Sequence, residues 1–326
     1  MPSRKNNAHG KGVLVIGGII VDMIVRSPEH FRVENGKLCF PYDTKLQIKD
    51  FTFDIGGSAH NAAANLSNLG TKTYLFGCVG NEPYGEMALQ NLKLYSVDTR
   101  FVKKVEGFTG ISVVFITNGE KTILTYRGAN DFLGKERFSP KILEKVGTVI
   151  ITSLISPNNV RLMKKVVDEA RKRKIQIIVN PSMSMVHHRP KELKYALRRG
   201  DVAIMNGKEA MMITGSKNVE SALKELKKFG LKTVIVTQDV RGSIVVDGAE
   251  IFRVPSFKVK VADTTGGGDS FTAGFVHAKK KGLSTKEAVR FASAVAALNI
   301  FTPGASTDLP SERRVFSFMK KARYNR

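Results

Sequence analysis

The chain has 326 residues, of which 42% are hydrophobic, so it can bury the core of one large α/β domain. Its two cysteines, Cys39 and Cys78, are too few for a disulfide framework and lack metal-ligand spacing, so we expect the reducing cytoplasm as its compartment. Lysine and arginine (52) exceed aspartate and glutamate (29), and the net charge of +23 raises two kinds of partner, phosphorylated ligands and nucleic acid.

The basic residues gather in short clusters, such as 171–174 and 198–199, most of which fall in or beside predicted amphipathic helices. Solvated helix faces therefore explain these clusters without a partner. The sequence has no zinc-finger spacing, no RNA-recognition aromatic motif and no tryptophan, which leaves nucleic acid as the weaker alternative partner. No apolar stretch approaches the ~18 residues needed to span a bilayer, so we expect no membrane segment.

The first elements in chain order are β-strands. Residues 1–11 are polar and basic and predict a disordered tail. The apolar run that follows is interrupted by Gly17-Gly18 and Asp22, so it indicates strands rather than a signal peptide. Two stretches, about 19–55 and 108–128, then predict a small β appendage. Their strands are expected at 19–25, 37–40, 45–53, 110–117 and 121–127, the last two joined by an Asn-Gly hairpin turn at 118–119.

From about residue 143, continuous apolar strands alternate with amphipathic helices. Such strands are typical of a parallel sheet that is covered on both faces, and right-handed crossovers then produce a doubly wound α/β domain. The strands are expected at 148–152, 175–179, 202–205 and 233–237, and the helices at 158–173, 191–198 and 221–229.

The segment 261–275 holds the most informative motif, in which three glycines lead into a predicted helix. Glycines at a helix start let backbone N–H groups approach an anion, and the helix dipole adds favourable potential there. Gly266, Gly267 and Gly268 therefore predict a cradle for a phosphate or an oxyanion. Asp269 follows at once, where a phosphate ligand would be repelled, so it indicates a proton acceptor; a capping aspartate on a glycine-rich turn is the alternative.

This segment resembles the signature D-T-x-G-x-G-D of the ribokinase-like (PfkB) carbohydrate kinases, and the matching residues are Asp263, Thr264, Gly266, Gly268 and Asp269. The resemblance implies that Asp269 is the catalytic base and that the amides of residues 266–268 form the anion hole. It also implies a K⁺ position at Asp263 and Thr265.

Two earlier segments resemble the substrate side of the same family. Gly56 and Gly57, followed by Asn61 in a helix of small residues, imply contacts with hydroxyl groups of the acceptor. Asp22 resembles the family's early aspartate, which accepts hydrogen bonds from the sugar, since a buried carboxylate needs such partners. Arg127, on the predicted hairpin, is assigned to the acceptor as well.

The donor side is implied by residues that follow the later strands. Asn206 and Glu209 resemble the family's Asn-x-x-Glu element, in which Glu209 would hold Mg²⁺ through water; an N-cap with a first-turn glutamate is the alternative. Thr237 and Gly242 resemble the nucleotide loop, although Asp239 replaces a glycine. The assigned nucleotide-binding residues are Asn180, Asn206, Glu209, Thr237, Asp239, Gly242 and Ser293, the last at a position where the family often has asparagine.

The resemblance extends from about residue 13 to residue 310. It implies one ribokinase-like domain over 12–326, with three αβα layers, in which the β appendage is a lid that covers the substrate and in many relatives pairs two subunits. We therefore expect an ATP-dependent, Mg²⁺-requiring phosphotransferase that acts on a hydroxymethyl group of a sugar, as ribokinases and fructokinases do. A nucleoside kinase is the main alternative; from another class, a non-catalytic or nucleic-acid-binding protein on the same fold remains, because Asp239 and Ser293 depart from the family pattern.

Overall fold

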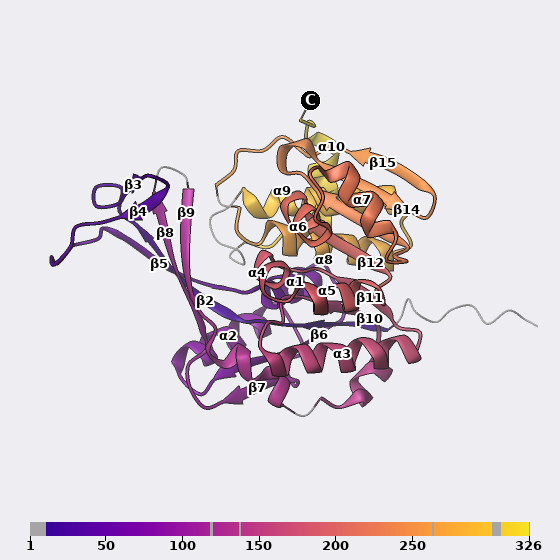
Figure 1. Cartoon of the computed structure of the whole chain (residues 1–326), viewed down its shortest axis with the longest axis horizontal. Coiled ribbons are helices and arrows are strands. Elements are labelled where there is room, and N and C mark those ends of the chain that lie inside the picture. Colours follow the sequence, from indigo (N-terminus) through magenta and orange to yellow (C-terminus); the bar gives the residue numbers. More distant parts are fainter. Residues whose placement is uncertain (1–10, 118–119, 137, 263, 302–307, 326) are drawn as a thin grey trace, which may run out of the picture.

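The computed structural model of the chain describes residues 11–325 except 118–119, 137, 263 and 302–307. A nine-stranded sheet forms its centre, and a four-stranded sheet, called the small sheet below, stands out to one side (Figure 1). Residues 1–10 of the predicted tail and the predicted hairpin turn at 118–119 lie outside the described residues.

The central sheet is parallel over most of its width, as the apolar strands predict. All neighbouring pairs from β7 across to β13 are parallel, whereas β14 and β15 form an antiparallel hairpin at one edge that the sequence did not reveal. In sheet order the strands are β15 (Glu250–Val254), β14 (Ser243–Asp247), β13 (Thr233–Thr237), β12 (Val202–Asn206), β11 (Gln176–Val179), β10 (Val146–Ile151), β1 (Gly12–Ile16), β6 (Thr73–Gly80) and β7 (Val102–Val105).

Helices cover both faces of this sheet, which confirms the predicted three-layer architecture. Their apolar faces pack into two separate cores, one on each side of the sheet, so the inner parallel strands are buried on both faces. One core contains α3 (Pro157–Lys172), α4 (Met183–His188), α5 (Pro190–Leu197), α6 (Gly207–Thr214) and α7 (Val219–Lys227). The other contains α1 (Ser58–Asn68), α2 (Pro83–Leu94), α8 (Gly267–Lys280), α9 (Thr285–Ile300) and α10 (Glu312–Lys321).

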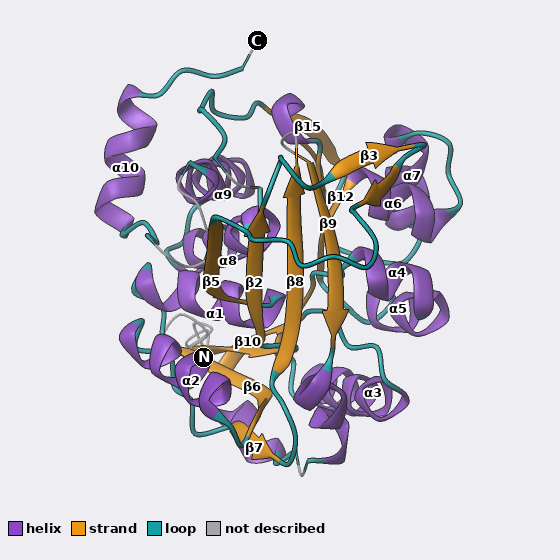
Figure 2. Cartoon of the chain, turned by 90° about the vertical axis from the view of Figure 1, so that its left-hand side faces the viewer, coloured by secondary structure: helices purple, strands orange, loops and turns teal. Residues whose placement is uncertain are grey.

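The small sheet combines segments from both predicted β stretches (Figure 2). Its order is β5 (Asp50–Gly56), β2 (Ile20–Arg26), β8 (Gly110–Thr117) and β9 (Glu120–Tyr126), and a separate hairpin joins β3 (Arg32–Glu34) to β4 (Lys37–Cys39). The strand predicted at 45–53 is displaced, because β5 pairs with all seven residues of β2, from Asp50 opposite Arg26 to Gly56 opposite Ile20.

Three short 3₁₀ helices complete the described elements: η1 (Gly128–Lys135), η2 (Pro140–Lys145) and η3 (Asp239–Arg241). Within the part of the chain that the structure describes, every helix is too short or too polar to cross a bilayer.

Candidate active site

A cavity of about 160 Å³ opens where β11, β12 and β13 end. Parallel strands end at the same edge of their sheet, and open α/β sheets bind ligands at that edge. The cavity is lined by Ser58, Asn180, Pro181, Ser182, Ile204, Met205, Asn206, Glu209, Thr237, Gly266, Gly268 and Asp269. Seven of the residues assigned from the sequence therefore face one space: Asn180, Asn206, Glu209, Thr237, Gly266, Gly268 and Asp269.

The three glycines form the start of α8. Gly266 is the N-cap and has φ +75°, in the left-handed region that glycine adopts most easily. A β-carbon on Gly268 would meet no atom within 4 Å, so the space beside this residue is open, whereas one on Gly267 would lie 3.1 Å from Ile300 Cγ2. The first N–H groups of a helix have no partner within it. This helix start can therefore bind an anion.

The carboxylate of Asp269 reaches from α8 to α1. Asn61 Nδ2 donates a hydrogen bond of 3.1 Å to Asp269 Oδ2 across 208 positions of sequence. Burial, with a smaller contribution from the nearby Glu209 carboxylate, raises the pKa of Asp269 to about 7, although hydrogen bonds from Asn61 and Ser58 oppose the rise. A carboxylate with a pKa near neutrality is suited to accept a proton from a bound hydroxyl group.

Glu209 is a capping residue, as one of its two interpretations predicts, and it also lines the cavity. It forms a capping box with Asn206 at the start of α6, since the Glu209 N–H donates to Asn206 Oδ1 and the Asn206 N–H donates to Glu209 Oε2, each over 2.9 Å. The same carboxyl group also lines the cavity. Burial raises its pKa to about 7, against the hydrogen bonds from Asn206. The carboxyl groups of Glu209 and Asp269, both with raised pKa values, therefore face one small cavity. A cation in that cavity would stabilise the ionised form of both.

The oxygen atoms around this cavity fit Mg²⁺. Asn180 Nδ2 donates to Ile204 O over 3.1 Å, but the buried Asn180 Oδ1 has no hydrogen-bond partner among the described residues. A buried oxygen without a partner points to a ligand or a water. No group of three or more His, Cys, Asp or Glu side chains that could hold a metal occurs in the described ranges. The protein oxygens thus suit an ion that keeps several waters and binds phosphate, as Mg²⁺ does.

Four of the acceptor residues assigned from the sequence, Asp22, Gly56, Gly57 and Asn61, lie close to one another. A β-carbon on Gly56 would lie 2.5 Å from Asp22 Oδ2 and 3.9 Å from Asn61 Oδ1. One on Gly57, which has φ +94°, would lie 2.6 Å from Gly18 O. Only glycine at these positions lets β5, β2 and α1 approach so closely. Asp22 and Asn61 therefore both lie beside Gly56, and the hydrogen bond from Asn61 links this group to Asp269.

The face of the small sheet that carries Asp22 also carries other polar side chains. Asp22 pairs with Ser112, and Ser112 pairs with Thr125, so the three side chains share a face. Lys121 lies on the same face, four residues before Thr125 on β9, and its Nζ donates to Thr265 Oγ1 over 2.8 Å. The N-terminal end of β9 therefore contacts the segment that directly precedes the three glycines at the start of α8.

Several assigned residues lie apart from the cavity lining. Arg127 forms an ion pair of 2.6 Å with Asp131 at the start of η1. Asp239, where the family pattern has glycine, takes φ +50°, so it adopts the backbone conformation that glycine would provide. Gly242 and Ser293 also lie outside the lining, and Asp263 lies outside the described residues.

Sequence reasoning missed three residues of this region: Ser58, Ser182 and Lys121. Ser58 follows the double glycine directly, and Ser182 follows β11 as the N-cap of α4, so the motif and the capping position were signals for both. Nothing in the sequence indicates the bond from Lys121 to Thr265, because it joins residues 144 positions apart.

Comparisons with known proteins agree with this geometry. The family model described as pfkB family carbohydrate kinase matches residues 11–312. The chain is 28% identical over 305 residues to an ATP-dependent 6-phosphofructokinase from Thermoanaerobacterium thermosaccharolyticum, covering 91% of this chain and 90% of that protein.

Solved structures show the same fold. The Arabidopsis thaliana ribokinase, solved with ribose and ATP, superposes with a TM-score of 0.81 and 25% identity, covering 95% of this chain and 99% of that one. An adenosine kinase from Sinorhizobium meliloti also gives a TM-score of 0.81 at 25% identity, with 96% and 99% covered. These similar proteins differ in the acceptor that their names state.

Proposed function

Since the chain belongs to the pfkB family of carbohydrate kinases, we propose that this kinase transfers the γ-phosphoryl group of ATP to a hydroxymethyl group of a sugar. The observation that carries the proposal is Asp269, which lies in the first turn of the glycine-rich start of α8, accepts a hydrogen bond from Asn61 and has a pKa raised to about 7. Both cysteines are free thiols, in keeping with a reaction in the reducing cytoplasm.

On the acceptor side, Asp269 removes the proton of the hydroxyl group as the new O–P bond forms. The hydrogen bond from Asn61 fixes the carboxylate, so that its other oxygen can face the acceptor. Asp22 accepts hydrogen bonds from neighbouring hydroxyl groups of the sugar, and the absence of a β-carbon at Gly56 and Gly57 lets the acceptor come close to the backbone.

On the donor side, the N–H groups of residues 266–268 stabilise negative charge on the transferring group. Glu209 and Asn180 would hold Mg²⁺ through water, and the ion would neutralise charge on the phosphate oxygens. Asn206 and Thr237 line the same cavity, which supports their assignment to the nucleotide. The proposal also includes a K⁺ ion bound at Asp263 and Thr265, which would activate the enzyme.

The small sheet acts in this proposal as a lid, because Asp22 belongs to it and Lys121 joins it to Thr265. Its other face carries four exposed apolar side chains, Phe51 (43% exposed), Phe53 (47%), Leu124 (61%) and Tyr126 (59%). An exposed apolar face of this kind is typical of a protein interface, and it supports pairing of two subunits through the lid.

An uncharged acceptor suits the face of the lid best. Asp22, Ser112 and Thr125 offer a carboxylate and two hydroxyl groups to a polyhydroxylated molecule, whereas a phosphorylated sugar would meet the carboxylates of Asp22 and Asp269. A nucleoside is the second candidate, favoured by the similarity to the adenosine kinase.

A coupled nucleotide-turnover screen with Mg²⁺ tests the function and the acceptor together. Ribose, fructose, adenosine and fructose 6-phosphate are compared as acceptors, each with and without K⁺. We expect turnover with at least one free sugar and much less with fructose 6-phosphate. If no sugar or nucleoside is phosphorylated while the protein is folded, the proposed function is wrong.

The pH dependence of kcat/KM follows from the pKa of Asp269. The base is active when it is deprotonated, so activity should rise through pH 7 and fall about tenfold for each pH unit below the pKa. Added Mg²⁺ should move this limb to lower pH, because a cation stabilises the ionised carboxylates. Initial rates between pH 5 and 9 at two Mg²⁺ concentrations check both statements; a flat profile would contradict them.

Replacing Glu209 with glutamine should raise the Mg²⁺ concentration needed for half-maximal activity by at least about tenfold. Glutamine preserves the side-chain length and can still accept the hydrogen bond from the Asn206 N–H, so α6 keeps its cap. The control is Glu287→Gln, which makes the same change in the capping box of α9. Equal Mg²⁺ requirements in both variants would refute the assignment.

A further inference from the structure

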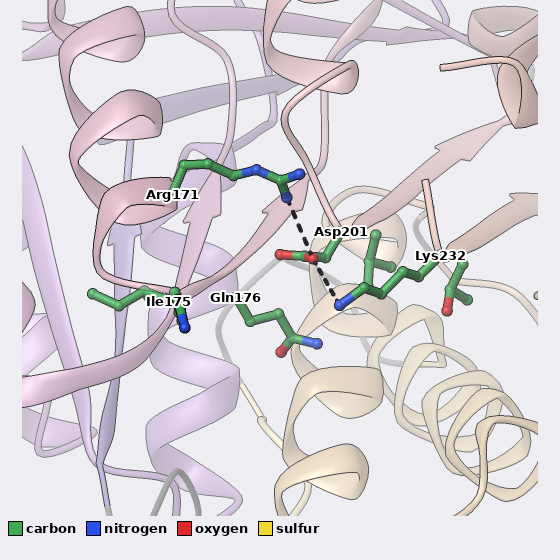
Figure 3. Close-up of a pocket in the computed structure, with 8 residues that line it drawn as sticks. Arg171, Ile175, Gln176, Asp201 and Lys232 are labelled. Carbon is green, nitrogen blue, oxygen red and sulfur yellow. Dashed lines mark ion pairs between the residues drawn. The ribbon is translucent and has the colours of Figure 1, made fainter. Parts of the chain in front are cut away.

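We propose that the chain has a second ligand site, for a small organic phosphate, in a cavity at the opposite edge of the central sheet. This cavity of about 470 Å³ (Figure 3) lies where β11, β12 and β13 begin, so the same three strands separate it from the candidate active site. It is lined by Arg171, Lys174, Ile175, Gln176, Asp201, Val202, Lys232 and Thr233. None of these residues has a role in the proposed kinase reaction.

The cavity carries more positive than negative charge. Three basic side chains, from Arg171, Lys174 and Lys232, surround the single carboxylate of Asp201. That carboxylate is largely committed to the fold, since its Oδ2 accepts the Ile177 N–H over 2.9 Å. A surplus of two positive charges therefore remains for an anionic ligand.

The ion pairs in the cavity are loose. Arg171 and Lys232 approach the same oxygen, Asp201 Oδ1, at 3.8 and 3.3 Å, both longer than a strong charge-assisted hydrogen bond. Figure 3 shows the two side chains reaching towards Asp201 from different sides of the cavity. They are 57% and 80% exposed, so either can turn to a ligand without breaking a buried contact.

Lys174 supplies the third charge at a conformational cost. It follows the C-cap of α3 with φ +55°, at a position where glycine is usual. Among the described residues, no carboxylate is paired with this lysine. Elsewhere at this edge, by contrast, Arg199 pairs with Asp168 and Lys228 pairs with Glu225. Compensation of the α3 dipole alone does not need a lysine in this backbone conformation, because Arg171 and Lys172 already occupy the last turn.

The uncharged lining indicates the organic part of the ligand. The Gln176 Oε1 accepts the Thr148 hydroxyl over 3.2 Å, which leaves the NH₂ group of Gln176 as a donor for the cavity. Ile175 and Val202, buried in the cores on the two sides of the sheet, close the floor of the cavity. An inorganic ion would leave most of this volume unfilled, whereas a nucleotide or sugar phosphate matches pockets of ~300–1,000 Å³.

Isothermal titration of the full chain tests the site with three probes: inorganic pyrophosphate, AMP and fructose 1,6-bisphosphate. The double variant Lys174→Gly/Lys232→Gln removes two charges from the cavity, and glycine at 174 suits the backbone there, so the fold should persist. The matched control, Lys172→Gln/Lys228→Gln, removes two charges from the same edge outside the cavity. We expect binding at the candidate active site to be the same in both variants, because the substituted residues lie at the opposite edge of the sheet.

We expect an organic phosphate to bind wild type and control alike, and the cavity variant at least about tenfold more weakly, at physiological salt. A parallel titration with a short RNA duplex separates this site from a nucleic-acid surface. The proposal is overturned if no organic phosphate binds, if the cavity variant binds like wild type, if both variants weaken equally, or if only the RNA binds.

Discussion

Replacing Asp269 with asparagine should lower kcat by roughly 10²–10⁴, the usual contribution of a positioned general base. Asparagine has the same shape and can still accept the hydrogen bond from Asn61, so ligand binding should change little. The loss should therefore appear in kcat rather than in KM, and single-turnover experiments with a sugar identified in the screen measure it directly. Near-normal turnover would sink the assignment of the base.

A stability measurement separates loss of the base from loss of the fold. The pKa of Asp269 is raised from its ordinary value of 3.8 to about 7 in the folded chain. The folded state therefore loses stability as the pH rises from about 4 to about 7, and the full cost of ionising this group is present above pH 7. A neutral asparagine removes this unfavourable term. At pH 8 the variant should thus unfold at the same temperature as the wild type or at a higher one.

Gly57→Ala should destabilise the fold strongly, by roughly 2–4 kcal/mol in the free energy of unfolding. The residue has φ +94°, and a β-carbon would lie 2.6 Å from Gly18 O and 2.9 Å from Ile20 N. These neighbours are backbone atoms of the segment that enters β2, so relief of the overlap must shift the strand that carries Asp22. Chemical denaturation of the two proteins measures the difference.

Gly70→Ala is the matched control, because Gly70 has φ +95° just beyond the other end of α1 and a β-carbon there would meet nothing within 4 Å. It should cost only about 1–2 kcal/mol, the price of the left-handed backbone alone. The difference between the two variants isolates the steric overlap. Equal destabilisation would show that no tight junction exists at Gly57.

The central sheet could be predicted because its signals are local. Continuous apolar strands such as 202–205 and 233–237, separated by amphipathic helices, specify a parallel sheet without any knowledge of distant contacts. The structure has these strands at Val202–Asn206 and Thr233–Thr237. The strand boundaries of the small sheet were harder to predict, because they depend on the length of the neighbouring strand. For example, β5 extends to Gly56 because Ile20 of β2 pairs with it there.

The two sides of the candidate site were also visible as motifs, but their connection was not. The bond between Asn61 and Asp269 depends on how α1 packs beside α8, and no local pattern encodes that distance. The αL backbone of Asp239 and the contact between Lys121 and Thr265 are tertiary features of the same kind. Sequence reasoning therefore found the chemical groups and left their spatial relation to the structure.

The position of Asp22 has a consequence for selectivity against water. Asp22 belongs to the small sheet, whereas Asn61 and Asp269 belong to helices on the central sheet, so the residues proposed to bind the acceptor are divided between two parts of the fold. A sugar has several hydroxyl groups and can bind both parts at once. A water molecule has a single oxygen and cannot bind both parts at once. Water therefore does not stabilise the closed arrangement that a sugar stabilises. ATP should consequently persist at the site until a sugar arrives.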